Sequence, residues 1–247
     1  MNLPARRRER DLVSDRVEGY DMNLARTLVI SVIALAAVAS GGSASEFRTA
    51  PDPAQDVAVA PDSTVQTAVF AGGCFWCTEA VFEQLAGVTD VVSGYAGGTA
   101  EQATYPAVSS GATDHAESIR VTYDPHRITY GKLLNVFFTV AHDPTQLNRQ
   151  GPDSGRQYRS AIFYDRDEQK QVAAAYMRQL EKARLFNQSF ATTLEPLDEF
   201  FPAEANHQDF VRRHPTHPYV RRYADPKVRK VRKHFASEAN AQTKDEP

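Results

Sequence analysis

Two consecutive glycines, Gly72 and Gly73, join two apolar segments of different periodicity and so constrain how this chain can fold. Residues 67–71 form a short apolar run typical of a buried strand. Residues 78–85 place their apolar side chains at helical spacing. Because glycine permits a tight bend, the helix N-terminus should begin directly at the end of the strand. The pattern therefore predicts a sheet strand that turns at once into a helix.

The chain's two cysteines and its single tryptophan all lie on this turn, in the order Cys74-Phe75-Trp76-Cys77. Free N–H groups and the helix dipole favour negative charge at a helix N-terminus, so we predict that Cys74 is a thiolate. The pKa of a free thiol, about 8.5, falls to roughly 3.5–7.5 in such surroundings. A redox pair, half of a zinc site and two inert buried thiols all fit this spacing. None of the seven histidines lies at a familiar zinc-site spacing from the pair.

The length and charge of the chain favour one catalytic domain with additional ends. Its 247 residues are 42% hydrophobic and 24% charged, which suffices for one core. With 28 basic and 31 acidic residues there is no strong field of either sign. Nucleic acid is therefore not expected as a partner.

The N-terminal residues resemble an export signal. From Met22, an alternative start of the protein, a short basic segment precedes the apolar run 28–39 and then small residues, the order of a secretory signal peptide. The apolar run is shorter than the roughly 20 residues of a membrane span. We expect a periplasmic or otherwise exported protein, with anchoring to the membrane by an uncleaved leader as the alternative. The predicted organisation is a leader at 1–44, a disordered linker at 45–66, the catalytic domain at 67–237 and a disordered tail at 238–247.

Hydrophobic periodicity predicts an α+β fold, a ferredoxin-like two-layer sandwich in which helices cover a mixed sheet. A long irregular C-terminal segment should follow beyond Asn206, and the basic run 225–234 should be a solvated face. The expected strands are 67–71, 88–95, 117–124, 158–164 and 190–197, and the expected helices are 78–85, 129–141 and 168–183.

Several further side chains suit chemistry beside the thiols. Phe75 and Trp76 could form an apolar wall, although core packing is the alternative. Glu117 enters a strand from a polar loop, where a raised pKa would make it a proton donor; a solvated carboxylate is the alternative. Phenols in the polar loops are suitable donors to a substrate oxygen. Tyr105 and Tyr158 are such phenols, and the carboxyl side chain of Asp153 lies in the same loops; a structural role is the alternative for each of the three.

Taken together, the motifs resemble the A-type peptide-methionine sulfoxide reductases from about Thr67 to Phe235. At least seven segments occur in the family's order. They are GCFWCTE at 73–79, GYAGG at 94–98, TY at 104–105, HAE at 115–117, HDPT at 142–145, QGPD at 150–153, QYRSAI at 157–162 and AEANHQ at 203–208.

The resemblance implies a role for each matching residue. Cys74 corresponds to the nucleophile and Glu117 to the acid that protonates the sulfoxide oxygen. The family acts on the S epimer of methionine sulfoxide, free or in proteins, needs no metal or organic cofactor, and is reset by an external thioredoxin-like thiol reductant. We expect a monomer. The remaining matches are Tyr105 and Tyr158 to the phenols that hold the oxygen, Phe75 and Trp76 to the methyl pocket, Asp153 to a substrate-orienting carboxylate, and His207 to a histidine near the site.

The sequence departs from the family pattern in its cysteines. Family members often carry resolving cysteines near the C-terminus, whereas this chain has none after Cys77. We therefore predict that Cys77 attacks the Cys74 sulfenic acid, with direct reduction by an outside thiol as the alternative. Two other functions remain open from the residues alone: thioredoxin-like disulfide exchange, and a non-enzymatic metal-binding module of the cell envelope. The chain also departs from the family's usual residues at Asp114, Gln102-Ala103 and Asn206.

Overall fold

The computed structural model describes residues 49–235, so the predicted leader and tail lie outside the described residues. Six strands form one sheet in the order β7-β6-β1-β3-β2-β8. All neighbouring strands are antiparallel except β6 and β7, which makes the sheet mixed and the fold α+β, as predicted. The strands are β1 (Gln66–Gly72), β2 (Val88–Ala96), β3 (Ala116–Tyr123), β6 (Ser160–Tyr164), β7 (Thr193–Pro196) and β8 (Phe200–Pro202); β4 (Arg149–Gln150) and β5 (Asp153–Ser154) form a separate pair.

The sheet topology gathers the predicted site residues at one edge. Strand β3 lies between β1 and β2 and is antiparallel to both, and β6 is antiparallel to β1. The C-terminal ends of β1 and β2 therefore lie beside the N-terminal ends of β3 and β6. Cys74 follows β1, Tyr105 follows β2, Glu117 begins β3 and Tyr158 precedes β6, so residues far apart in sequence converge there.

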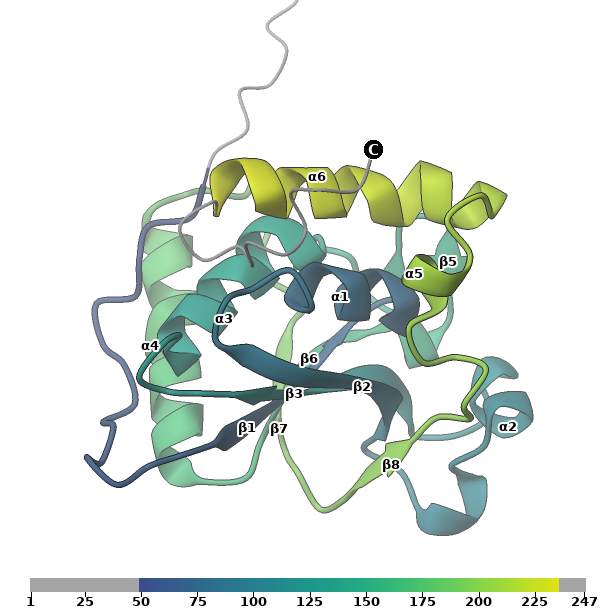
Figure 1. Cartoon of the computed structure of the whole chain (residues 1–247), viewed down its shortest axis with the longest axis horizontal. Coiled ribbons are helices and arrows are strands. Elements are labelled where there is room, and N and C mark those ends of the chain that lie inside the picture. The colour runs from purple at the N-terminus through teal and green to yellow at the C-terminus, as the bar shows by residue number, and fades with distance from the viewer. Residues whose placement is uncertain (1–48, 236–247) are drawn as a thin grey trace, which may run out of the picture. The chain divides into compact units, whose positions relative to one another are not determined.

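The main core lies between one face of the sheet and the helices. Phe70, Ile119 and Val121 point into it, whereas the alternating residues Val69 and Ala71 belong to a smaller cluster on the opposite face. Figure 1 shows α1 between the sheet and α6. The helices are α1 (Phe75–Phe82), α2 (Tyr105–Ser109), α3 (Tyr130–Val136), α4 (Asp167–Lys182), α5 (Phe210–Arg213) and α6 (Asp225–His234).

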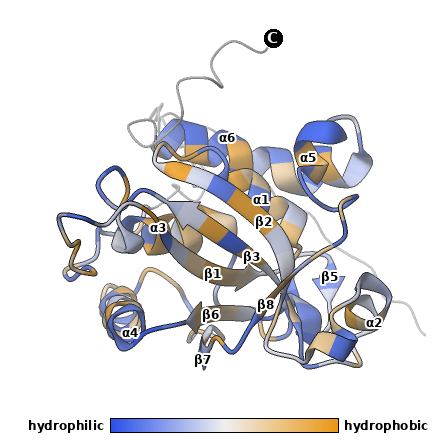
Figure 2. Ribbon diagram, turned by 60° about the horizontal axis from the view of Figure 1, so that its bottom comes forward, coloured by the Kyte–Doolittle hydropathy of each residue, from blue (hydrophilic) through white to orange (hydrophobic). Residues whose placement is uncertain are grey.

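The C-terminal segment is more helical than predicted. After α5, a π-helical turn at Val220–Ala224 leads directly into α6. Figure 2 shows hydrophobic and hydrophilic residues side by side along α6. Val231 and Phe235 enter the main core, while Val220 and Ala224 pack beside the two cysteines. The prediction of an irregular segment failed because short helices with few apolar positions give little periodic signal, although two apolar residues suffice to dock one.

The first part of the predicted disordered linker has a defined path along α3 and α4. Ala50 is buried, and its N–H donates to the Thr139 hydroxyl at 3.2 Å. Tyr176 of α4 donates to the Pro51 carbonyl at 2.8 Å, and Asp56 accepts from the Gly131 N–H at 2.8 Å. Side chains of the domain thus bind the backbone of Ala50 and Pro51, and the Asp56 side chain binds the backbone of α3, which a composition-based prediction could not foresee. Within residues 49–235, no helix is both long and apolar enough to cross a membrane.

Candidate active site

Gly73 gives the turn that delivers Cys74 to the helix N-terminus. Its φ is +88°, a left-handed conformation that favours glycine. A Cβ at Gly73 would lie 2.4 Å from the Cβ of Gln150, so the β4 strand also approaches too closely for a side chain. Cys74 then occupies the N-cap position of α1 and is 8% exposed. The predicted strand–turn–helix unit is confirmed.

Glu117 is a buried acid at the start of β3, beside the first turn of α1. Only 2% of the residue is exposed, and its Oε2 accepts the N–H of Phe75 at 3.0 Å. Burial raises the pKa of Glu117 to about 8, and the Phe75 hydrogen bond opposes this effect only in part. The carboxyl is therefore protonated at neutral pH and can donate a proton, as the sequence predicts.

The surroundings of the two thiols shift their pKa values in opposite directions, and for Cys74 the direction differs from the prediction. Burial raises the pKa of Cys74, and the nearby Cys77 and Glu117 raise it further. The hydrogen bond from Cys74 lowers the pKa of Cys77, against the effect of its burial, and the charge of Lys227 lowers it further. The prediction of an ionised Cys74 is wrong for this closed site. The main physical reason is burial, and the Phe75 N–H, the first amide of the helix, binds Glu117 rather than the sulfur.

Tyr219 connects the thiol pair with Asp153. Its hydroxyl donates to Asp153 Oδ2 at 2.5 Å and lies 3.9 Å from the Cys77 sulfur. Burial raises the pKa of Tyr219, so the phenol stays protonated. Lys227 lies near Cys77 and donates to the carbonyl of Ala141 at 2.6 Å. The C-terminal segment thus presents a phenol and a cation to the second thiol.

Phe75 and Trp76 form an aromatic cluster, as the apolar-wall prediction requires. Trp76 stacks on Phe210 of α5, with ring centroids 3.7 Å apart and planes 7° from parallel. Its indole N–H donates to His207 Nδ1 at 3.3 Å. Phe75 is buried, and its ring centroid lies 5.4 Å from that of His207.

The two predicted phenols lie in the electrostatic field of the same groups. Burial raises the pKa of Tyr105 and of Tyr158, and for both phenols Glu117, Cys74 and Asp153 raise it further. Both hydroxyls therefore remain protonated donors near neutral pH. The structure brings together all nine residues that the sequence predicts for the site.

Comparison with known proteins decides between the reactions that this geometry could support. The family model described as peptide methionine sulfoxide reductase matches residues 66–239. This chain belongs to that family. The reductase is 54% identical to the peptide methionine sulfoxide reductase MsrA 2 of Synechocystis over 79% of this chain and 92% of that protein. It is 52% identical to the Thermus thermophilus MsrA over 70% and 96%.

A solved structure with the same fold is Mxr1 of Saccharomyces cerevisiae in its reduced form. Its TM-score is 0.56 at 33% identity, covering 64% of this chain and 91% of Mxr1. Methionine sulfoxide reductase A of Corynebacterium diphtheriae gives a TM-score of 0.55 at 31% identity, covering 68% and 85%. The chain is therefore a thiol-dependent methionine sulfoxide reductase, and neither disulfide exchange nor an envelope metal module is favoured. Among the described residues, no group of three or more histidine, cysteine, aspartate or glutamate side chains could hold a metal ion.

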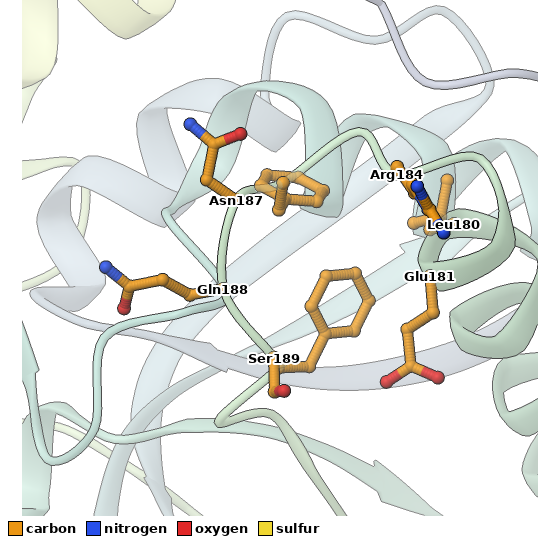
Figure 3. Close-up of a pocket in the computed structure, with 8 residues that line it drawn as sticks. Leu180, Glu181, Arg184, Asn187, Gln188 and Ser189 are labelled. Atoms are coloured by element: carbon orange, nitrogen blue, oxygen red, sulfur yellow. The ribbon is translucent and has the colours of Figure 1, made fainter.

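The cavity at the thiols of the reductase is small. It has a volume of about 70 Å³, and Cys74, Cys77, Asp153, Tyr219 and Lys227 are among the residues that line it. A larger cavity of about 560 Å³ lies at the end of α4 and the loop after it, and Figure 3 shows that Glu181, Asn187 and Gln188 are among its lining residues. No residue of the thiol site lines this larger cavity, so it does not contribute to the chemistry described above.

Sequence reasoning missed several residues of the reductase site. Tyr219 and Lys227 lie in the segment where periodicity is weak, and Phe210 gave no signal of its own. Glu204 lies within the AEANHQ segment but was not singled out. The histidine of the HDPT segment has a structural role: His142 is buried and lies 2.7 Å from the Ser160 hydroxyl.

Proposed function

We propose that the Cys74 sulfur attacks the sulfur of a bound methionine S-sulfoxide. The S–O bond breaks, the oxygen ends on Cys74 as a sulfenic acid, and methionine is released. The thiol loses two electrons and the sulfoxide sulfur gains them; the thiol proton leaves Cys74 as the new S–O bond forms. Glu117 donates its proton to the oxygen in the transition state, and the proton that leaves the Cys74 thiol passes to the Glu117 carboxylate, so the sulfenic acid carries one proton and Glu117 is restored.

The environment of Cys74 supports this reaction. Glu117, with a pKa of about 8, is a neutral acid at physiological pH. Tyr105 and Tyr158 are protonated phenols in the same field and can donate hydrogen bonds as negative charge grows on the oxygen. Phe75 and Trp76 offer apolar rings for the substrate methyl group, and Asp153 can orient the polar part of the substrate. Because the thiol itself has a raised pKa, protonation of the oxygen and attack by sulfur must be closely coupled.

Cys77 then attacks the Cys74 sulfenic acid, releasing water and forming a disulfide that a thioredoxin-like dithiol reduces. The hydrogen bond between the two thiols and the lowered pKa of Cys77 support this step, because the attacking species is a thiolate. Direct reduction of the sulfenic acid by an external thiol is the alternative. In that case Cys77 would remain a reduced thiol throughout the cycle.

The hydrogen-bonded Cys74–Cys77 pair beside the neutral acid Glu117 is the observation that carries the proposal. We test it by incubating the fully reduced enzyme with excess S-sulfoxide and no reductant. One methionine per enzyme with loss of two titratable thiols is expected. Loss of one thiol would refute the resolving role of Cys77 alone, and no methionine would refute the reaction. Cys77→Ser should give a normal burst but slow recycling with thioredoxin, whereas Cys74→Ser should give no burst.

We also propose a ferredoxin-like arrangement, supported by the antiparallel order β6-β1-β3-β2 with α1 and α3 as the connecting helices. Export through the leader, periplasmic location and a monomeric state are proposed on the sequence alone. Mass spectrometry of the mature N-terminus tests cleavage before Ser45, and an intact leader would favour the anchored form. Sedimentation equilibrium tests the monomer, and a dimer mass would contradict it.

A further inference from the structure

Trp76 is held on its face and on its edge by different groups. Phe210 stacks on the face, 3.7 Å between ring centroids. At the edge, the indole N–H donates to Nδ1 of His207 at 3.3 Å, and His207 is only 5% exposed. The contact with Phe210 is apolar and does not change with pH. The contact with His207 depends on the protonation of the imidazole.

The Trp76 hydrogen bond fixes which proton His207 carries. An imidazole accepts at Nδ1 only when the ring is neutral and its proton is on Nε2. That Nε2 faces Glu204 Oε2 at 4.0 Å, which favours the required tautomer. Burial lowers the pKa of His207, and the charge of Glu204 raises it by a smaller amount. The ring is therefore the neutral acceptor near pH 7.

Glu204 also forms hydrogen bonds with two tyrosines of the pocket. Its Oε1 accepts the N–H of Tyr105 at 2.8 Å, and its Oε2 accepts the hydroxyl of Tyr95 at 2.9 Å. Burial acts to raise the pKa of Glu204, but these hydrogen bonds together have the larger effect, so its pKa is lowered and the carboxylate stays ionised. Tyr105 begins α2, so one carboxylate fixes the start of the helix that presents this phenol and also faces His207. The rings of Tyr105 and His207 lie 4.3 Å apart.

We propose that His207 and Glu204 are positioning residues that hold Trp76 against the methyl group of the bound sulfoxide. This assignment rests on the proposed function of the Cys74 site. Glu204 orients His207, and neutral His207 fixes the edge of the indole. Protonated His207 cannot accept the indole N–H, so at acid pH the Trp76 side chain loses the hydrogen bond that fixes its position in the pocket. The KM for the sulfoxide then rises, while kcat, which depends on Cys74 and Glu117, changes less.

The groups that face the His207 ring keep their charge as the pH falls below 6.5, and His207, whose pKa burial lowers, is the one that changes charge there. Glu117, with a pKa of about 8, is protonated throughout this range. Burial raises the pKa of Cys74 and of the neighbouring phenols, so none of them ionises there. Glu204, whose pKa is lowered, stays ionised. These groups are Glu204 on the same loop, Cys74 beside α1, Tyr95 on β2, Tyr105 on α2 and Glu117 on β3. Glu79 of α1, with a pKa of about 7, lies beside the backbone of Phe210 rather than the imidazole, and every His207 variant retains it.

Because Trp76 is the only tryptophan, its fluorescence reports this contact without requiring turnover. We would titrate the full-length enzyme from pH 8 to 4.5 and measure KM and kcat for N-acetylmethionine S-sulfoxide with dithiothreitol. His207→Phe keeps a ring but removes the acceptor. His207→Asn keeps an acceptor oxygen near the position of Nδ1 but does not titrate. His214→Asn is the control, because His214 also lies near Phe210 but does not contact the indole N–H.

The wild type and His214→Asn should show a fluorescence transition below pH 6.5 that both His207 variants lack. At pH 7.5, His207→Phe should raise KM about five-fold, the change expected for one lost hydrogen bond, and His207→Asn should recover most of it. An unchanged transition in His207→Phe, or an unchanged KM, would overturn the proposal. If the wild type formed no methionine, the proposed function would fail, and the fluorescence transition would still decide the His207 contact. Thermal unfolding identifies variants that fail to fold.

Discussion

Replacing Glu117 by glutamine should abolish rapid catalysis while making the protein less sensitive to alkali. The amide keeps an acceptor for the Phe75 N–H but cannot donate an acidic proton. Loss of a general acid typically reduces a rate by about 10²–10⁴-fold, so we expect the methionine burst to slow by this amount. In the wild type, the burst should slow as pH rises through about 8, because Glu117 then loses its proton.

The same carboxyl should affect stability in a predictable direction. Its folded-state pKa of about 8 is above the unfolded value of 4.5, so the folded state binds the proton more tightly. Stability from this group is complete below pH 4.5 and is lost as pH rises through 8. Linkage gives a loss of roughly 3 kcal/mol between pH 6 and pH 9. Other buried acids titrate in the same range, so the informative quantity is the difference between the wild type and Glu117→Gln.

Urea unfolding of both proteins at pH 6 and pH 9 measures that difference. The wild type should lose roughly 3 kcal/mol more than Glu117→Gln over this interval. Glu168→Gln, at an exposed position of α4, is the matched control and should follow the wild type. Parallel losses in the wild type and Glu117→Gln would show that Glu117 does not titrate there, and a normal burst rate in the variant would exclude it as the acid.

Three further predictions follow from other parts of the structure. Lys227→Met should raise the pKa of Cys77 and slow disulfide formation about ten-fold at pH 7, with recovery at higher pH. The loss of thiols after the burst measures this rate. Equal rates in the wild type and the variant would exclude an electrostatic role of Lys227. Burial lowers the pKa of His142 to about 3, below its unfolded value of 6.5, so the protein should lose about 2 kcal/mol of stability through this group between pH 7 and pH 5. Urea unfolding at both pH values measures this loss in the wild type and in His142→Gln. A variant that kept the full loss would contradict the prediction. Gly73→Ala should lower Tm more than Gly151→Ala, because both have positive φ but only Gly73 has a close neighbour; equal changes would show that the neighbour adjusts freely.

The sequence was most informative where local pattern and backbone geometry coincide. The strand and helix around Gly73 could be predicted because the change from strand to helix periodicity is itself the signal. The helix predicted at 168–183 agrees with α4 at Asp167–Lys182 for the same reason. The C-terminal helices could not be predicted, because the burial of Val231 and Phe235 is decided by contacts with distant parts of the chain.

The chemistry of the site was predictable in residue type but not in proton location. The motifs identified Cys74, Cys77 and Glu117, and the structure brings them together. A helix N-terminus near a thiol predicts a thiolate only if an amide is free to bind it. Here a carboxyl 42 positions later in the chain takes the Phe75 N–H, and no local pattern encodes that competition.

The C-terminal segment supports the proposed resolving role of Cys77 in a chain without a cysteine in that segment. Instead of a thiol, this segment places Tyr219 and Lys227 near Cys77. A cation beside a buried thiol stabilises its thiolate, and the thiolate is the attacking form. Burial raises the pKa of Cys74, whereas the hydrogen bond from Cys74 and the charge of Lys227 lower the pKa of Cys77, which favours the second thiol as the attacking thiolate. The segment therefore supports resolution through electrostatics rather than by supplying sulfur.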